Sequence, residues 1–382
     1  MSILPVPGVI SFARGVPAPE MFPVDELAEA SRRAFSKHSE TALNYGAPGG
    51  FPPLQEWIAR QHAAQPGQVV ISPGSWALLA ILVRALARPG APVLMEAPSY
   101  DRMTSVLRRT GARVVPVRHG LDGLDLDELE DVLQGCLRAS QRPAFFYVMP
   151  SFHNPTGTTM SGPDRERLAD LAIRHDLLLI EDDPYGLLRW DGEVPASLRD
   201  LLMARGAGHL SIFTSSFSKT VAPGLRVGYG VLPDALVSSV ATMALDAYVS
   251  PPLWPQAVVY EFLAAGFLPP HLARIRDLLR LRRDALAGRL GAGLDGLARW
   301  SMPDGGYFLW LELPCGLSAV DLHADCERAG VTFVPGPGFF TAGGGQNAAR
   351  LSFSYPSAGD IRAGADRLVA AVRGRLVSAG GR

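Results

Sequence analysis

Cysteine and net charge are both scarce in this chain. Of 382 residues only three are cysteine, namely Cys136, Cys315 and Cys326. They are widely spaced and form no Cys-x-x-Cys pair, which argues against a disulfide framework and a zinc site. We therefore expect no metal and a reducing, cytoplasmic setting. The formal net charge is −1, so there is no electrostatic footprint for nucleic acid or an anionic membrane, and the expected partner is a small molecule.

Long apolar runs and several common site motifs are also missing. No run approaches the ~20 residues that a membrane-spanning helix needs, and residues 1–7 lack the basic start of an export signal. The chain has no P-loop, no His-Glu-x-x-His and no Gly-x-Ser-x-Gly. A G-x-G-x-x-G match at 291–296 follows a predicted helix instead of a strand, so we reject it as a dinucleotide site.

What the chain does contain is a regular alternation of apolar strands and helices. With 47% hydrophobic residues it can build a large core. Helices are predicted at 75–88, 99–110, 125–138 and 162–175, and they separate apolar runs at 69–72, 92–96, 113–117, 144–149, 177–181, 210–214 and 226–232. This order predicts an α/β fold with a mostly parallel seven-stranded sheet that binds ligands beyond the carboxyl ends of its strands.

The alternation loosens after residue 233 and predicts a smaller α+β domain. Helices are expected at 233–247, 255–265, 270–289, 318–329 and 358–376, the third ending at Gly291, with strands near 298–302, 306–312, 331–334 and 350–354. The N-terminal segment reads as a strand near Ser11, turns, and a helix from Pro23 to about His38. We expect a large domain at 38–265 and a small domain formed by 1–37 and 266–382.

A lysine follows one of the predicted strands. The segment Ser216-Phe217-Ser218-Lys219 is followed by Pro223-Gly224-Leu225-Arg226, so hydroxyl and cationic groups gather between two strands. A lysine placed there loses hydration, which favours its free amine and allows it to condense with an aldehyde. From this segment alone, a solvated surface lysine is the alternative.

Two other strand ends carry groups that could meet a ligand. Gly74-Ser75-Trp76 opens a helix after the strand 69–72, which indicates either an anion site or an ordinary serine N-cap. Tyr100 follows the strand 92–96 and would either pack or stack on a ring. Asp182 and Asp183 end the strand 177–181, and because successive strand residues face opposite sides, only one of them can face a given ligand.

The turn after the strand 144–149 contains His153-Asn154-Pro155. Asn154 either bonds its own turn or presents its amide to the ligand edge. We do not favour His153 as a catalytic base, because no partner carboxylate is visible in the sequence and a packed or solvated histidine is commoner. Asp182 suits a counter-ion to a ring cation, with the hydroxyl of Tyr185 reaching the same ring.

These pieces together resemble a known family. Asn154-Pro155-Thr156-Gly157, Asp182-x-x-Tyr185, Ser216-Phe217-Ser218-Lys219 and Pro223-Gly224-Leu225-Arg226 occur in the order and spacing of the class I/II aminotransferases, which are fold type I pyridoxal 5′-phosphate enzymes. The chain looks most similar to the branch of 2-aminoadipate and aromatic aminotransferases and the aminotransferase-like half of MocR regulators. The resemblance runs from Ser11 to about residue 376.

The resemblance implies a role for each site residue. Lys219 would bind pyridoxal 5′-phosphate as a Schiff base and move the substrate proton, while Asp182 would keep the pyridine nitrogen protonated. Asn154 and Tyr185 would bond the phenolic oxygen, and Tyr100 would stack on the ring. The groups implied at the phosphate are Gly74, Ser75, Trp76, Ser216, Ser218, Arg226 and, across a homodimer interface, Tyr45.

The resemblance also implies a substrate clamp, with departures from the family pattern. Arg350 would bind the substrate α-carboxylate beside Asn154 and Gly15. The family loop usually reads Ser-Phe-Ala-Gly-Gly, but here Arg14 takes the fourth position. Arg14 would bind an acidic substrate group, or else turn outward or pair with a neighbour. Trp76 stands where glutamine is frequent, so part of the phosphate cup would depend on backbone and stacking.

The expected activity is transfer of an amino group between an L-amino acid and a 2-oxo acid. Two alternatives remain open at this stage. One is a lyase or β/γ-replacement enzyme that forms carbon–carbon bonds on the same fold, motivated by Arg14 and the short N-terminal segment. The other is a non-catalytic cofactor sensor, which would need a DNA-binding winged helix for which we expect no room in this chain.

Overall fold

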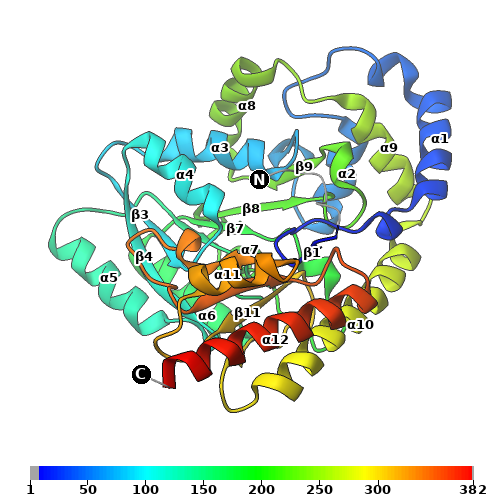
Figure 1. Cartoon of the computed structure of the whole chain (residues 1–382). Helices are drawn as coiled ribbons and strands as arrows, with labels where there is room; N and C mark the ends of the chain where they lie inside the picture. The colour runs from blue at the N-terminus through cyan, green and yellow to red at the C-terminus, as the bar shows by residue number, and fades with distance from the viewer. Residues whose placement is uncertain (1–7, 381–382) are drawn as a thin grey trace.

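A twisted eight-stranded sheet forms the centre of the molecule, seen in a computed structural model that describes residues 8–380 (Figure 1). Its strand order is β2-β9-β8-β7-β6-β3-β4-β5. The bounds are β2 (Val69–Ser72), β3 (Pro92–Ala97), β4 (Arg113–Gly120), β5 (Gly123–Leu124), β6 (Phe146–Val148), β7 (Leu179–Asp182), β8 (Ser211–Ser216) and β9 (Gly228–Val231). All seven predicted strands are present, and the two-residue β5 adds an eighth through a hairpin with β4.

The sheet is mostly parallel, as predicted. The pairs β4–β3, β3–β6, β6–β7 and β7–β8 are parallel, whereas β9 runs antiparallel to both β8 and β2. The carboxyl ends of the parallel strands therefore meet at one edge, where the candidate residues of β7 and β8 and of the loops after β3 and β6 come together.

Helices cover both faces of the sheet. Alternate residues of β6 enter different cores, since Tyr147 belongs to one cluster and Phe146 and Val148 to the other. The second cluster is closed by α5 (Leu126–Arg138), α6 (Gly162–His175) and α7 (Leu198–Ala204). The first is closed by α3 (Ser75–Leu86), α4 (Asp101–Thr110), α8 (Asp234–Tyr248) and α9 (Leu253–Ala264). Strands buried on both sides explain their continuous apolar runs.

A smaller antiparallel sheet lies beside the large one. Its order is β10-β11-β14-β13, with β10 (Arg299–Trp300), β11 (Phe308–Glu312), β13 (Val334–Pro335) and β14 (Ala348–Ser352). It is accompanied by the helices α10 (Leu268–Leu294), α11 (Ala319–Arg328) and α12 (Ala358–Gly380), and α10 and α12 lie together in Figure 1. The N-terminal strand β1 (Ile10–Ser11) pairs in parallel with β12 (Val331–Thr332), which brings the start of the described chain to this region.

Several element predictions need correction. Helix α10 continues through Gly291 to Leu294, and α1 (Val24–Ala42) runs past His38. A glycine in a helix costs only about 1 kcal/mol, which the burial of Leu290 and Leu294 outweighs. The short helices α2 (Pro52–Gln61) and α7 were not predicted. Among the described residues, no helix combines the length and the apolar character needed to cross a membrane.

Candidate active site

Lys219 lies in the turn that follows β8, partly buried, with its amine facing the N-terminal segment. The Nζ atom donates to the Gly15 carbonyl at 2.8 Å, and the Tyr307 hydroxyl donates to the Lys219 carbonyl at 3.0 Å. Burial lowers the pKa of Lys219 to about 8, assisted by the positive charges of Arg350, Arg226 and Arg102. The neutral amine is therefore a much larger fraction at physiological pH than for an ordinary lysine, which suits a nucleophile.

Asp182 ends β7 with its carboxylate buried. Oδ2 accepts from the Tyr147 hydroxyl at 2.7 Å, and Oδ1 accepts from Thr214 Oγ1 at 3.0 Å. Burial raises the pKa of Asp182 to about 6, although the bonds from Tyr147 and Thr214 favour the ionised form. Asp183 turns elsewhere and accepts from the Gly186 N–H at 2.7 Å. As the strand alternation predicted, only one of the two carboxylates is available at this position.

Arg350 joins the small sheet to the Asn154 turn. It lies within β14, and Nη1 donates to Asn154 Oδ1 at 2.9 Å while Nη2 donates to the Ala13 carbonyl at 3.0 Å. The guanidinium carbon lies over two aromatic rings, 4.3 Å from the Phe308 centroid and 5.0 Å from that of Phe339. Its Nε atom is buried and has no hydrogen-bond partner. A rigid, incompletely satisfied guanidinium of this kind can bind a carboxylate with two parallel bonds.

The start of α3 forms a tight cradle with Arg226. Gly74 has φ of 88°, and a Cβ atom there would lie 2.3 Å from Arg226 Nη2. Gly74 is the N-cap, and no side chain caps the helix, so the alternative of a serine N-cap is wrong. The first backbone N–H groups of α3 thus remain available for an anion. Arg226 is held by the carbonyls of Pro73 and Pro223, at 3.0 and 3.2 Å.

Two serines extend this cradle from the lysine turn. Ser216 Oγ donates to Ser218 Oγ at 2.8 Å, and the Ser218 N–H donates back to Ser216 Oγ at 3.1 Å. A Cβ atom on Gly228 would lie 2.0 Å from the Ser75 nitrogen, so β9 and the start of α3 approach as closely as a glycine permits. The donors predicted from two distant segments therefore meet at one place.

Aromatic rings surround the space between these groups. Trp76 and Tyr100 meet edge to face, with centroids 5.8 Å apart. Burial raises the pKa of Tyr100 to about 12, and burial also raises that of Tyr185 well above its ordinary value, so both hydroxyls stay protonated. Tyr185 is buried, 5.4 Å from the Tyr307 ring and 5.9 Å from the Phe308 ring between centroids.

Arg14 and Tyr45 stand apart from this group. The Arg14 guanidinium lies 4.1 Å from the centroid of the Tyr355 ring, and its carbonyl accepts from Ser352 Oγ at 2.8 Å. This contact favours the interpretation that Arg14 pairs with a neighbour. Tyr45 follows α1 and is 83% exposed, so its own chain does not bring it into the site. Gly15 packs against Phe308, where a Cβ atom would lie 2.6 Å from Cζ.

Several neighbours of the site were missed from the sequence. Thr214 lies opposite Asp182 in the β7–β8 register, so a register prediction could have found it. Phe308 begins β11 of the small sheet and Tyr307 directly precedes it, and nothing in the local pattern connects them to Lys219. His153 does have a carboxylate beside it that was not visible in the sequence, because Glu96 of β3 lies 3.2 Å from its Nε2. His153 is fully buried, so its packed interpretation is confirmed.

Comparisons with known proteins agree with this geometry. The family model of class I and II aminotransferases matches residues 7–368. The chain is 38% identical to a 2-aminoadipate transaminase of Thermus thermophilus, over 97% of this chain and 91% of the relative. It is 30% identical to an aromatic-amino-acid aminotransferase of Thermococcus litoralis, over 96% of this chain and 88% of the relative.

A solved structure extends the likeness to three dimensions. The α-aminoadipate aminotransferase of Thermus thermophilus, solved with N-(5′-phosphopyridoxyl)-L-leucine, superposes with a TM-score of 0.91 at 37% identity, covering 97% of this chain and 94% of that one. The fold is that of the fold type I pyridoxal-phosphate enzymes. The partly buried lysine amine, the buried carboxylate and the anion cradle fit that cofactor. This chain therefore belongs to the class I and II aminotransferase family of pyridoxal 5′-phosphate-dependent enzymes.

Proposed function

We propose that this aminotransferase moves the amino group from an L-amino acid to a 2-oxo acid with Lys219 as its covalent cofactor anchor and Arg350 as its substrate clamp. The observation that carries the proposal is the convergence of these two residues. Lys219 Nζ bonds the Gly15 carbonyl, and Arg350 Nη2 bonds the Ala13 carbonyl, so both lie against the same short segment. An α-amino acid held by its carboxylate at Arg350 would present its α-carbon toward the amine.

Pyridoxal 5′-phosphate supplies an aldehyde and an electron-withdrawing ring when it is bound. In the proposed arrangement Asp182, held by Tyr147 and Thr214, keeps a proton on the ring nitrogen. A cation beside this buried carboxylate favours its ionised form. Asn154 and Tyr185 donate to the phenolic oxygen. The residues proposed at the phosphate are Gly74, Ser75, Trp76, Ser216, Ser218 and Arg226.

Lys219 is also proposed to carry the proton of the substrate α-carbon. Its lowered pKa, about 8, means that the released amine can accept a proton and return it near neutral pH. The rings of Tyr100, Tyr185 and Phe308 exclude water around this transfer, which strengthens the interactions among the remaining polar groups. Arg350 keeps the carboxylate in place, so the α-carbon stays within reach of the amine.

The proposal includes a homodimer in which Tyr45 of one subunit serves the phosphate of the other. Its support is the exposure of Tyr45 together with exposed apolar neighbours, since Leu43 is 65% and Phe35 is 54% exposed. Exposed apolar groups of this kind are typical of interfaces. A cytoplasmic location is proposed as well, supported by the three free cysteines, two of which are buried.

The names of similar proteins suggest which substrate side chains this enzyme accepts. Two relatives are named for 2-aminoadipate and for aromatic amino acids, and one similar structure was solved with N-(5′-phosphopyridoxyl)-L-leucine. The proposed donors are therefore acidic, aromatic and branched L-amino acids. The lyase alternative was motivated partly by Arg14, whose contact with Tyr355 supports a packing role there. Arg14 is therefore not proposed as the sole determinant of an acidic substrate.

A single-turnover assay tests the proposal. The holoenzyme is incubated without an oxo acid in the presence of L-2-aminoadipate, L-glutamate, L-leucine or L-tyrosine. We expect at least one donor to yield pyridoxamine phosphate and its 2-oxo acid in equal amounts. Lys219→Ala should lose this reaction. Arg350→Gln should require a higher donor concentration to reach half of the maximal single-turnover rate. Release of ammonia or a β-substituent in place of pyridoxamine phosphate would support the lyase chemistry and overturn the proposal.

A further inference from the structure

Tyr307 reaches from the edge of the small sheet to the backbone of Lys219. It directly precedes β11 and is 1% exposed, and its hydroxyl donates to the Lys219 carbonyl at 3.0 Å. Burial raises the pKa of Tyr307 well above its ordinary value, so the hydroxyl keeps its proton and remains a donor. Among the residues that the structure describes, no backbone N–H donates to the Lys219 carbonyl. A phenol from a distant segment therefore satisfies this acceptor.

The turn that carries Lys219 is closed by bonds of its own. The Val221 N–H donates to the Phe217 carbonyl at 2.8 Å, and the Phe217 N–H donates to the Val227 carbonyl at 3.0 Å. These bonds fix the two sides of the turn and do not involve Tyr307. The bond from Tyr307 instead holds the single peptide plane that follows Lys219. This restricts the backbone dihedral angle of Lys219, and the direction of the lysine side chain follows from that angle.

Tyr307 also faces the other end of Lys219. The centroid of its ring lies 5.6 Å from Lys219 Nζ, and the same Nζ atom donates to the Gly15 carbonyl at 2.8 Å. A lysine side chain is a flexible stem that otherwise samples many rotamers. Contacts at both the carbonyl and the amine restrict these rotamers, so fewer conformations remain to be lost when the amine reacts.

The backbone of Tyr307 is tied to the strand of the substrate clamp. Its carbonyl accepts from the Phe353 N–H at 3.0 Å, and Phe353 directly follows β14, which carries Arg350. The next residue, Phe308, has its ring centroid 4.3 Å from the guanidinium carbon of Arg350. Tyr307 therefore lies between the clamp and the amine, and its hydroxyl is the group that reaches the lysine backbone.

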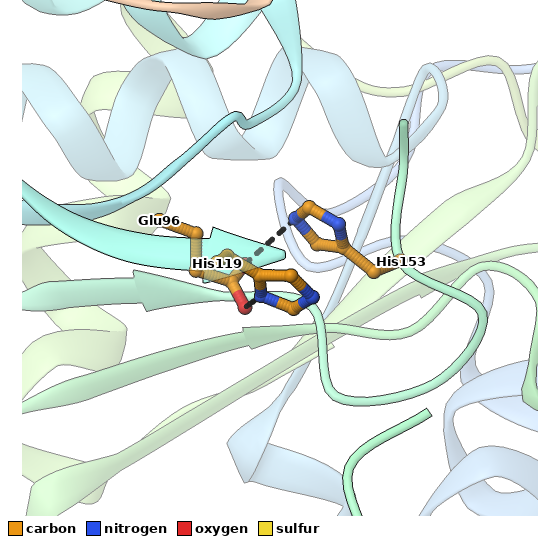
Figure 2. A group of neighbouring side chains, drawn as sticks. All are labelled: Glu96, His119 and His153. Carbon is orange, nitrogen blue, oxygen red and sulfur yellow. Dashed lines mark hydrogen bonds and ion pairs between the residues drawn. The ribbon is translucent and has the colours of Figure 1, made fainter. Parts of the chain in front are cut away.

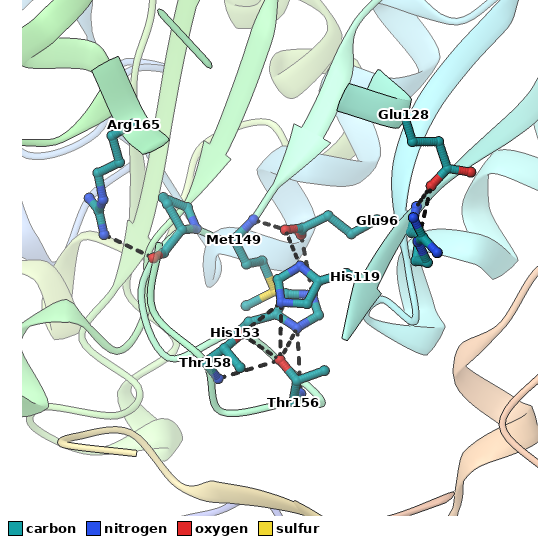
Figure 3. Close-up of polar contacts among 10 residues, drawn as sticks. Glu96, His119, Glu128, Met149, His153, Thr156, Thr158 and Arg165 are labelled. Atoms are coloured by element: carbon teal, nitrogen blue, oxygen red, sulfur yellow. Dashed lines mark hydrogen bonds and ion pairs between the residues drawn. The ribbon is translucent and has the colours of Figure 1, made fainter. Parts of the chain in front are cut away.

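The clamp itself has anchors that do not include this hydroxyl. Arg350 Nη1 donates to Asn154 Oδ1 at 2.9 Å, and the turn that carries Asn154 is held from the large sheet. The buried side chains beside this turn, drawn in Figure 2, are Glu96, His119 and His153. His119 Nε2 lies 2.7 Å from Thr158 Oγ1 at the end of the turn (Figure 3). Loss of the phenol hydroxyl alone should thus leave the binding of a carboxylate unchanged.

We propose that Tyr307 is a positioning residue that holds Lys219 in the conformation from which its amine reacts. The reaction is the condensation of the neutral amine with the cofactor aldehyde. A carbon–nitrogen double bond forms, one water leaves, and nothing is oxidised or reduced. This role of Tyr307 rests on the proposed function of Lys219 as the cofactor anchor. The hydroxyl of Tyr307 contributes to the rate of this step and not to the binding that precedes it.

Cofactor uptake by the cofactor-free protein separates binding from reaction. Stopped-flow absorbance gives the rate of Schiff-base formation at increasing concentrations of pyridoxal 5′-phosphate, and this rate saturates as the phosphate cradle fills. We expect Tyr307→Phe to lower the maximal rate about tenfold, because the amine is less well oriented, and to leave the half-saturating concentration within about twofold. An unchanged maximal rate in a folded Tyr307→Phe, or an effect confined to the half-saturating concentration, would overturn the positioning role.

A second tyrosine controls for the loss of a buried hydroxyl. The Tyr248 hydroxyl is also buried, but it has no hydrogen-bond partner among the described residues. Tyr248→Phe therefore removes the same atom without breaking a bond, and we expect it to take up the cofactor at the wild-type rate. A fall equal to that in Tyr307→Phe would count against a specific role of Tyr307.

Replacement of Tyr307 by para-aminophenylalanine provides a rescue. It keeps the ring and an N–H donor, so it should restore the maximal rate of uptake to within a few-fold. Circular dichroism and the melting temperature check that each variant is folded. If Tyr307→Phe does not fold, para-fluorophenylalanine, which fills a similar volume without a donor, takes its place. Equal rates with and without the donor would overturn the role of the hydrogen bond.

The holoenzyme gives a second readout. We expect Tyr307→Phe to lower kcat for the amino donor about tenfold, while the Kd of a 2-oxo acid, measured by calorimetry, stays within about twofold. Cofactor uptake needs no amino donor, so it tests Tyr307 whether the holoenzyme is a transaminase or a lyase. Borohydride reduction and peptide mapping identify the residue that reacts. A label away from Lys219 would overturn the anchor role of Lys219, and the role of Tyr307 with it.

Discussion

At the scale of single residues, the site depends on burial that shifts two titratable groups toward neutrality. Lys219 is a base whose pKa falls, and Asp182 is an acid whose pKa rises. In both cases the first cause is loss of hydration, which penalises the charged form. The site of the free protein is therefore adjusted to receive a cofactor that carries its own charges.

The shifted pKa of Lys219 predicts how the cofactor-free protein binds pyridoxal 5′-phosphate. Only the neutral amine is nucleophilic, so the association rate should rise with pH around a midpoint of about 8. Arg350→Gln removes a nearby positive charge and should move the midpoint upward, toward the ordinary lysine value. Stopped-flow absorbance measures both midpoints. The exposed Arg299 provides a control, since Arg299→Gln should leave the midpoint unchanged. If the association rate instead keeps rising until the pH reaches the ordinary lysine pKa, with no midpoint near 8, the predicted shift of Lys219 is contradicted.

Asp182 predicts a conflict between stability and activity. Its pKa rises from 3.8 to about 6 on folding, so its contribution to stability is fully present below pH 3.8 and is lost as the pH rises through 6. Asparagine mimics the protonated carboxyl. Asp182→Asn should therefore raise the free energy of unfolding of the cofactor-free protein at about pH 8, by up to about 3 kcal/mol, with little gain at about pH 4.

The same variant should lose about 10²–10³-fold or more in kcat, because it removes the charge proposed to stabilise the ring cation. Urea unfolding at the two pH values and steady-state kinetics measure these effects. A variant that is less stable than the wild-type protein at both pH values would show that the bonds from Tyr147 and Thr214 outweigh the burial of the charge.

At the scale of elements, the decisive feature is where strands end and helices begin. The alternation of apolar strands with helices was sufficient to predict the parallel sheet and its ligand edge, and therefore the neighbourhood of Lys219, Asp182 and Asn154. Local pattern could not reveal that Arg350 of β14 would reach Asn154, because a chain separation of this size is closed only by packing of the two sheets. The positions of Tyr307 and Phe308 were missed for the same reason.

The geometry at the start of α3 predicts that two glycine variants have similar effects on stability but different effects on cofactor affinity. Gly74→Ala and Gly90→Ala both force a side chain into a left-handed backbone, with φ of 88° and 77°, and each should cost about 1–3 kcal/mol of stability. Only at Gly74 would the new Cβ meet Arg226, since Gly90 has open space around it. Gly74→Ala should thus also weaken cofactor binding, by roughly tenfold or more. Urea unfolding and a fluorescence titration separate the two effects, and equal cofactor affinities in both variants would count against the cradle.

At the scale of the whole molecule, the proposed homodimer predicts complementation between two inactive variants. Lys219→Ala lacks the amine, and Tyr45→Ala lacks the proposed phosphate contact. If Tyr45 acts across the interface, a heterodimer of the two has one site with an intact Lys219 and an intact Tyr45 from its neighbour. It should recover roughly half of the wild-type kcat, whereas each parent homodimer stays impaired.

Coexpression with two affinity tags isolates the heterodimer, and light scattering checks that it contains two subunits. The kcat of each preparation is divided by its number of sites that keep Lys219. If this value is no higher for the heterodimer than for the Tyr45→Ala homodimer, Tyr45 acts within its own chain or not at all. Action of Tyr45 within its own chain would not agree with this conformation, because Tyr45 is 83% exposed.

The sequence by itself determined the class of fold and the chemical groups at the strand ends, because strand and helix periodicity and turn residues are local properties. Its ordered motifs also indicated the family and the cofactor. The family resemblance implied that Arg350 lies near Asn154 and that Arg226 lies near Gly74, and the tertiary structure supplied the contacts themselves. Only the tertiary structure showed that Glu96 meets His153. The physical reason is that burial and pairing depend on how the two sheets and their loops pack, and those contacts leave no trace in the spacing of residues along the chain.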